Sequence, residues 1–126
     1  MWAGRFRGLV IVANLVYAAA LLVLGVVPDV PKIAVHIPDF AAHGFAYAGH
    51  TMLLFALLLP SIGRGKAAVF AVAGAALYGS LVEVLQFFQP TRTVEIGDLV
   101  ANSIGAGIAA MILFLVTGPR TTGGAR

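Results

Sequence analysis

Cysteine is absent from this sequence, which excludes disulfide bonds, thiolate nucleophiles and thiolate metal sites in any redox compartment. Charge is also scarce. Only 10% of the residues are Asp, Glu, Lys or Arg, whereas soluble domains typically have about 25%. Hydrophobic residues make up 60% of the chain. This composition excludes an ordinary soluble domain and indicates a membrane protein.

Four long apolar runs each approach the roughly 20 residues that a helix needs to span a bilayer. They cover residues 8–27, 40–62, 67–88 and 99–116. Prolines and the SIGRGK segment separate these runs, and little chain remains outside them. The sequence therefore predicts an all-α, polytopic membrane four-helix bundle. We expect residues 1–117 to form one domain and residues 118–126 a flexible cytoplasmic tail.

The first run has a basic start and an Ala-rich segment, Tyr17–Ala20, that resembles a signal-peptide cleavage region. A signal core is about 7–15 residues long, but hydrophobicity here continues to Val27. We therefore expect an uncleaved first helix.

Basic residues divide unevenly between the two sides of these predicted spans. Six of the eight lie before the first span, between the second and third, or after the fourth: Arg5, Arg7, Arg64, Lys66, Arg120 and Arg126. Only Lys32 and Arg92 lie on the other side. Because cytoplasmic segments carry the excess of Lys and Arg, both termini are predicted to be cytoplasmic. No basic patch interleaved with aromatics is present, so no nucleic-acid partner is expected.

Small residues recur at four-residue spacing in the third and fourth runs. They are Ala71, Ala75 and Gly79, and then Ala101, Gly105 and Ala109. Such stripes allow helices to approach closely in lipid, and we expect them to pack the bundle.

Polar residues concentrate in the outer halves of the last three spans. Asp39, His43 and Tyr47 are four residues apart and share one helix face, with His43 and Tyr47 progressively deeper. Glu83 and Gln86 share a face of the third span, with the glutamate about 10 Å inside the helix end by helical rise.

The fourth span contributes Asp98 and Asn102, also on one face, and the loop before it contains Arg92. An ionisable side chain inside the hydrocarbon normally faces the bundle or a wet cavity. Since these depths coincide, we expect an outward-facing polar cavity lined by four residues: His43, Glu83, Gln86 and Asn102. Arg92 supplies a planar fork suited to phosphate or carboxylate.

Structural explanations exist for several of these residues. Asp39 and Asp98 stand at predicted helix starts, where capping and the helix dipole favour a carboxylate. Arg92 can be a solvated loop residue. His50 is expected to be a helix-contact histidine.

No cofactor or metal ion is predicted. His36, Asp39 and His43 are a weak pattern for metal binding, because Pro38 interrupts the helical turn between them.

In the segments DFAAHGFAY, YGSLVEVLQFFQPTR and DLVANSIGAG, the sequence resembles the VanZ-like family of small bacterial membrane proteins. The resemblance covers roughly Asp39 to Ala110. It departs from the family pattern at Phe40, where a lysine often follows the aspartate. The resemblance implies a multi-pass envelope protein of the bacterial cytoplasmic (inner) membrane, and the family's namesake is associated with low-level resistance to teicoplanin, a lipid-tailed glycopeptide.

These observations lead us to expect a protein that binds an anionic amphipathic lipid or lipid-linked envelope precursor. The candidate ligand-binding residues are Asp39, His43, Tyr47, Glu83, Gln86, Arg92, Asp98 and Asn102. Two alternatives stay open. One is a lipid-modifying enzyme that uses Glu83 or His43 as acid or base. The other is an accessory subunit of a larger membrane complex.

Overall fold

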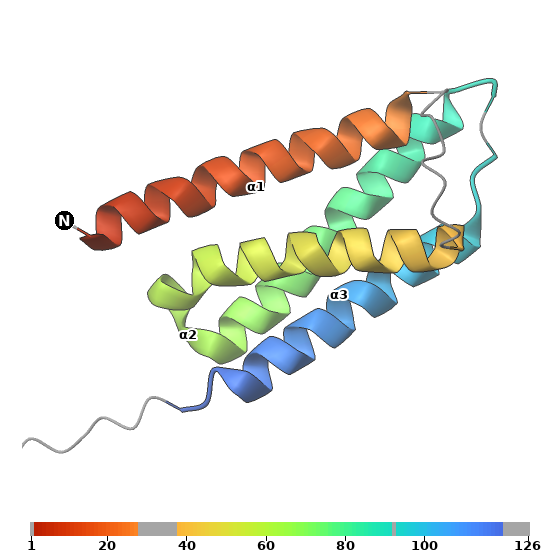
Figure 1. Cartoon of the computed structure of the whole chain (residues 1–126). Coiled ribbons are helices and arrows are strands. Elements are labelled where there is room, and N and C mark those ends of the chain that lie inside the picture. The colour runs from red at the N-terminus through yellow and green to blue at the C-terminus, as the bar shows by residue number, and fades with distance from the viewer. Residues whose placement is uncertain (1, 28–37, 92, 120–126) are drawn as a thin grey trace, which may run out of the picture.

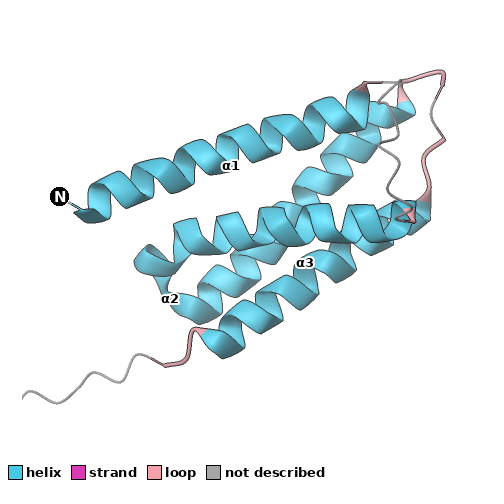
Figure 2. Ribbon diagram, viewed as in Figure 1, coloured by secondary structure: helices cyan, strands magenta, loops and turns pink. Residues whose placement is uncertain are grey.

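The computed structural model describes residues 2–27, 38–91 and 93–119, and all regular structure in this part of the chain is helical (Figure 1; Figure 2). The helices are α1, Trp2–Val26, α2, Asp39–Phe87, and α3, Ile96–Val116. Each is long and apolar enough to cross a membrane. The all-α prediction is confirmed for the described residues, and the helices are those of a multi-pass membrane protein.

The described residues form three helices rather than the predicted four, because the second and third predicted spans are the two halves of α2, 49 residues long, which are joined at a bend. Only Gly63 leaves the helical conformation inside it, with φ of 76°. Glycine adopts this backbone readily since it has no Cβ. Figure 1 shows the helix folding back at this bend. We call residues 39–62 the first arm of α2 and residues 64–87 the second arm.

The helix ends also differ from the predicted ones. α1 begins at Trp2 rather than at residue 8, and α3 begins at Ile96 rather than at residue 99. Asp98 is therefore in the first turn of α3, and Glu95 is the N-cap residue. Residues 28–37, from the predicted first outer loop, and residues 120–126, from the predicted tail, lie outside the described residues.

α3 packs closely against α2 through small residues. Gly105 of α3 lies against the backbone of Gly44 in the first arm, so close that a Cβ at position 105 would overlap the Gly44 carbonyl. Ala75 of the second arm and Ala106 of α3 are completely buried in one cluster with Tyr47. Small side chains therefore permit the close backbone approach that stabilises helix packing in lipid.

α1 contacts α2 through polar side chains that reach backbone carbonyls. The Tyr17 hydroxyl donates to the Ala46 carbonyl at 2.8 Å, and the Asn14 amide donates to the Leu53 carbonyl at 3.0 Å. Most other side chains of α1 are exposed and apolar, which suits a helix whose outer face contacts lipid.

Arg64, directly after the bend, attaches α2 to the end of α3. Its guanidinium donates to the Phe114 carbonyl at 3.0 Å and lies 4.3 Å from the centroid of the Phe114 ring. A cation is favourable at the C-terminal end of a helix and over an aromatic face. Figure 1 shows the start of α1 and the end of α3 at the same end of the bundle as this bend.

Candidate functional site

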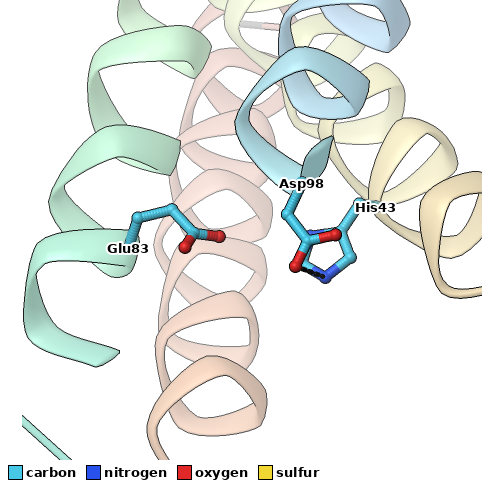
Figure 3. Close-up of side chains that lie close together, drawn as sticks. All are labelled: His43, Glu83 and Asp98. Atoms are coloured by element: carbon cyan, nitrogen blue, oxygen red, sulfur yellow. Dashed lines mark ion pairs between the residues drawn. The ribbon is translucent and has the colours of Figure 1, made fainter. Parts of the chain in front are cut away.

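Three ionisable side chains from three helical segments meet near the opposite end of the bundle. His43 comes from the first arm of α2, Glu83 from the second arm and Asp98 from the first turn of α3. One ligand atom from each residue lies within 4.8 Å of the others. Figure 3 shows the Glu83 carboxylate directed toward the His43–Asp98 pair. The helical hairpin of α2 and its packing on α3 therefore create this cluster.

Two residues of α3, one turn apart, hold the His43 ring. Nδ1 of His43 lies 3.2 Å from Oδ1 of Asn102, and Nε2 lies 3.5 Å from Oδ2 of Asp98. An amide oxygen only accepts hydrogen bonds, so this contact places a proton on Nδ1. Asn102 is 1% exposed and has little freedom to move. The ring orientation and the tautomer of His43 are set together by these contacts.

A cavity of about 250 Å³ adjoins this cluster between α1 and the two arms of α2. Its ionisable and amide side chains, His43, Glu83 and Gln86, come from α2, and the leucines that line it come from α1. The lining residues are Leu21, Leu24, Gly25, Ala42, His43, Ala46, Tyr47, Val82, Glu83 and Gln86. The cavity therefore presents hydrogen-bonding groups and hydrocarbon surface to the same space.

Gln86 and the nearby Gln89 stabilise the end of α1. The Gln86 side-chain amide donates to the Gly25 carbonyl at 2.8 Å, and that of Gln89 donates to the Val26 carbonyl. The last carbonyls of a helix have no intrahelical donor, and in a membrane little water is present to replace one. Gln86 thus borders the cavity and also caps α1.

His50 lies deeper in the bundle and belongs to a separate aromatic group. It is 4% exposed, and its ring centroid is 6.1 Å from that of Tyr17, 6.4 Å from that of Tyr47 and 5.1 Å from that of Tyr78. These contacts fit the expected role of a histidine at a helix contact.

The structure brings together most of the candidate residues, although their part in ligand binding stays a prediction. His43, Tyr47, Glu83 and Gln86 border the cavity, while Asp98 and Asn102 contact His43. Asp39 is exposed and does not border the cavity. Arg92 lies outside the described residues.

Sequence reasoning missed the contribution of α1 to the site. Leu21, Leu24 and Gly25 line the cavity from this helix. A Cβ at Gly25 would lie 2.5 Å from Cγ1 of Val82, so α1 approaches the second arm closely here. The sequence feature that could have indicated this close approach is a glycine near the end of a long apolar run.

Apolar helices of spanning length around a polar cluster and cavity define a multi-pass helical membrane protein with a candidate binding site inside the bundle. The family model described as VanZ/LLP1 matches residues 10–117. The chain therefore belongs to the VanZ/LLP1 family, as the resemblance from Asp39 to Ala110 indicated, and the match extends through most of α1. No curated protein and no solved structure matches the chain.

Proposed function

We propose that this protein binds an anionic amphipathic lipid, or a lipid-linked envelope precursor, in the cavity between α1 and α2. The observation that carries the proposal is the two-sided wall of that cavity. His43, Glu83 and Gln86 offer groups for a polar head, while Leu21 and Leu24 offer hydrocarbon contacts for a chain. A membrane lipid has both a polar headgroup and apolar chains, so it matches both kinds of surface, whereas few soluble metabolites do.

The size of the cavity supports a particular way of binding. Its volume, about 250 Å³, is below the roughly 300–1,000 Å³ typical of pockets that enclose a whole drug-sized ligand. A headgroup fits such a volume, and a complete lipid does not. We infer that the headgroup enters the cavity and that the acyl chains remain in the bilayer beside the apolar face of α1.

We propose that this site faces the outer side of the bacterial cytoplasmic membrane, because the distribution of basic residues favours cytoplasmic termini. The native chain has no cysteine, so single cysteines at Thr93 and Ser61 give an unambiguous labelling test. In intact cells, an impermeant thiol reagent should label the cysteine at position 93 and leave that at position 61 unlabelled. The reverse pattern contradicts this orientation.

Lipid retention tests the binding function directly. The protein is purified in a mild detergent, exchanged into vesicles of phosphatidylglycerol or of zwitterionic phosphatidylethanolamine, re-extracted and analysed by native mass spectrometry. We expect the anionic lipid to remain bound and the zwitterionic lipid to be lost. Equal retention of both lipids, or of neither, contradicts the proposal.

Two substitutions separate the contributions expected of Arg92 and Glu83. Arg92→Lys keeps the charge but loses the planar fork, so headgroup affinity should fall while the protein still inserts and folds. Glu83→Gln keeps the shape and removes the exchangeable proton, so it should raise thermal stability if the carboxylate is charged when buried. Ser103→Ala is the matched control, because Ser103 is exposed on α3 and its hydroxyl donates only to the local Leu99 carbonyl. If both variants retain lipid like this control, the polar cluster is structural, and the accessory-subunit alternative replaces the proposal.

A lipid-modifying enzyme is the second candidate, and the contact of 3.2 Å between Nδ1 of His43 and Oδ1 of Asn102 favours it. A histidine that donates one ring N–H to a fixed oxygen keeps the lone pair of its other nitrogen for use as a general base, and Glu83 stands close enough to exchange a proton with a shared substrate. Incubating retained lipid with the protein and analysing it for conversion separates the two functions. Turnover that Glu83→Gln abolishes supports the enzyme, and unchanged lipid supports the binding protein.

Family membership also supports a proposed link to teicoplanin resistance, since this drug carries a lipid tail. Expressing the protein in a susceptible strain should raise the inhibitory concentration of teicoplanin. An unchanged inhibitory concentration, at confirmed expression in the membrane, contradicts this link without affecting the lipid-binding proposal.

A further inference from the structure

We infer that His43, Glu83 and Asp98 bind a divalent transition-metal ion of the zinc or manganese kind. One imidazole nitrogen and two carboxylate oxygens, from three helical segments, lie within 4.8 Å of one another (Figure 3). Imidazole suits zinc and carboxylate oxygen suits manganese, so this mixed set is compatible with both ions. It differs from the pattern His36, Asp39 and His43, on which no metal site was predicted.

The charge of the three side chains is the first reason. Glu83 is 7% exposed, and Asp98 is partly buried. With a neutral imidazole the three side chains together carry two negative charges when both carboxylates are ionised, and with a protonated one they still carry one. Concentrating like charge in a poorly solvated region is costly. A divalent cation at the point where the three side chains meet would interact favourably with both carboxylates.

The orientation of His43 is the second reason. Its Nδ1 donates to Asn102, so in the neutral ring the lone pair is on Nε2 and faces Oδ2 of Asp98 at 3.5 Å. Two electron-rich atoms at this distance require a proton or a cation between them. Histidines that bind metals characteristically donate their other ring N–H to a protein oxygen, which is the role that Asn102 has here.

The separations of the ligand atoms are the third reason. An ion held tetrahedrally at about 2.1 Å from its ligands keeps those ligands about 3.4 Å apart. The His43–Asp98 separation of 3.5 Å already has this value. The remaining separations, within 4.8 Å, need a shift of at most about 1.4 Å, which rotation of the Glu83 side chain can supply.

The cavity beside the cluster gives this ion a function. Three protein ligands leave at least one coordination position open, as in zinc sites that act on a bound molecule. His43 and Glu83 both border the cavity, so the open position faces it. This step rests on the proposed lipid binding: two carboxylates alone repel an anionic headgroup, whereas a divalent cation between them attracts its phosphate.

The test uses the purified full chain in detergent, stripped with a chelator and dialysed against Zn²⁺, Mn²⁺ or Mg²⁺, with bound metal measured by mass spectrometry. We expect about one zinc or manganese ion per chain and much weaker magnesium binding. Glu83→Gln and Asp98→Asn preserve side-chain shape, and each should lower affinity by at least about 10-fold, while Ser103→Ala keeps it. Absence of bound zinc and manganese, or wild-type affinity in both ligand variants, overturns the inference.

Cobalt substitution keeps the test decisive even if a variant fails to fold. The visible spectrum of wild-type protein loaded with Co²⁺ should show bands of ligand-bound cobalt that differ from those of the hydrated ion. An unchanged hydrated-ion spectrum overturns the metal site.

Lipid retention measured with and without Zn²⁺ distinguishes this inference from the function on which it rests. If zinc binds but phosphatidylglycerol is not retained, the proposed function fails and the metal site stands. If phosphatidylglycerol is retained equally after chelation and no metal binds, the metal site fails and the proposed function stands.

Discussion

The two helix interfaces of this protein are held in different ways. Between α2 and α3, backbones touch: Gly105 lies against Gly44, and completely buried alanines fill the contact. Between α1 and α2, side chains reach across to carbonyls, as Tyr17 does to Ala46 and Gln86 to Gly25. The two interfaces do not differ through the hydrophobic effect, because lipid chains are as apolar as the side chains and burying apolar surface between helices gains little.

This difference shows the two means of helix association that a membrane leaves available. Close packing of small residues gains many van der Waals contacts and tolerates no added atom. Interhelical hydrogen bonds each contribute less but accept longer helix separations, which leaves space beside them. In this protein the space is the cavity lined by Leu21, Leu24 and Glu83. The looser interface is therefore the one that contains the candidate binding site.

The largest effect is expected at the close interface. Gly105→Ala places a methyl group on the Gly44 carbonyl, and backbone atoms on both helices have to move apart. The free energy of unfolding in detergent should fall by at least the roughly 1–3 kcal/mol of an overpacked core. Gly107→Ala is the control: no neighbouring atom lies within 4 Å of its added Cβ, so it should be neutral or stabilising. Equal unfolding midpoints for the two variants would show that α2–α3 packing is not close.

The same substitution at the looser interface should cost less. Gly25→Ala brings a methyl group to 2.5 Å from Cγ1 of Val82, which is a side-chain atom, so a shift of Val82 away from its preferred rotamer can relieve the contact. We expect a loss of about 0.5–1.5 kcal/mol, the cost of an off-rotamer side chain. The cavity should narrow as well, so lipid retention should fall. A loss of stability as large as that of Gly105→Ala contradicts the distinction between the interfaces.

The smallest effect is expected from removing one hydrogen bond between α1 and α2. Tyr17→Phe keeps the ring but loses the donor to the Ala46 carbonyl, which should cost about 0.6 kcal/mol, the average for such bonds in a membrane protein. Chemical denaturation in detergent measures it. Ser103→Ala serves as the control, since its hydroxyl bonds only within α3. A loss in the free energy of unfolding above about 2 kcal/mol would show that this single hydrogen bond is the main contact holding α1 to α2.

Much of the candidate site could be predicted because depth along a helix follows directly from residue number. The four-residue spacing of His43 and Tyr47, and the position of Glu83 before Pro90, placed these groups at comparable depths. The facing direction of each helix could not be predicted in the same way. Whether Gln86 points to a ligand or to the Gly25 carbonyl depends on how α1 and α2 are rotated about their axes.

The sequence by itself determined that this chain is a membrane protein, since apolar runs of spanning length have no other stable environment. It also determined the family, because the order and spacing of Asp98, Asn102 and Gly105 are local properties of the chain. Only the tertiary structure decided that the two arms of α2 fold back on each other at Gly63 and that α1 lines one side of the cavity. It also decided that Asp98 rather than Asp39 reaches His43. The physical reason is that these contacts join distant parts of the chain, and in lipid they depend on how closely small residues let the helices approach.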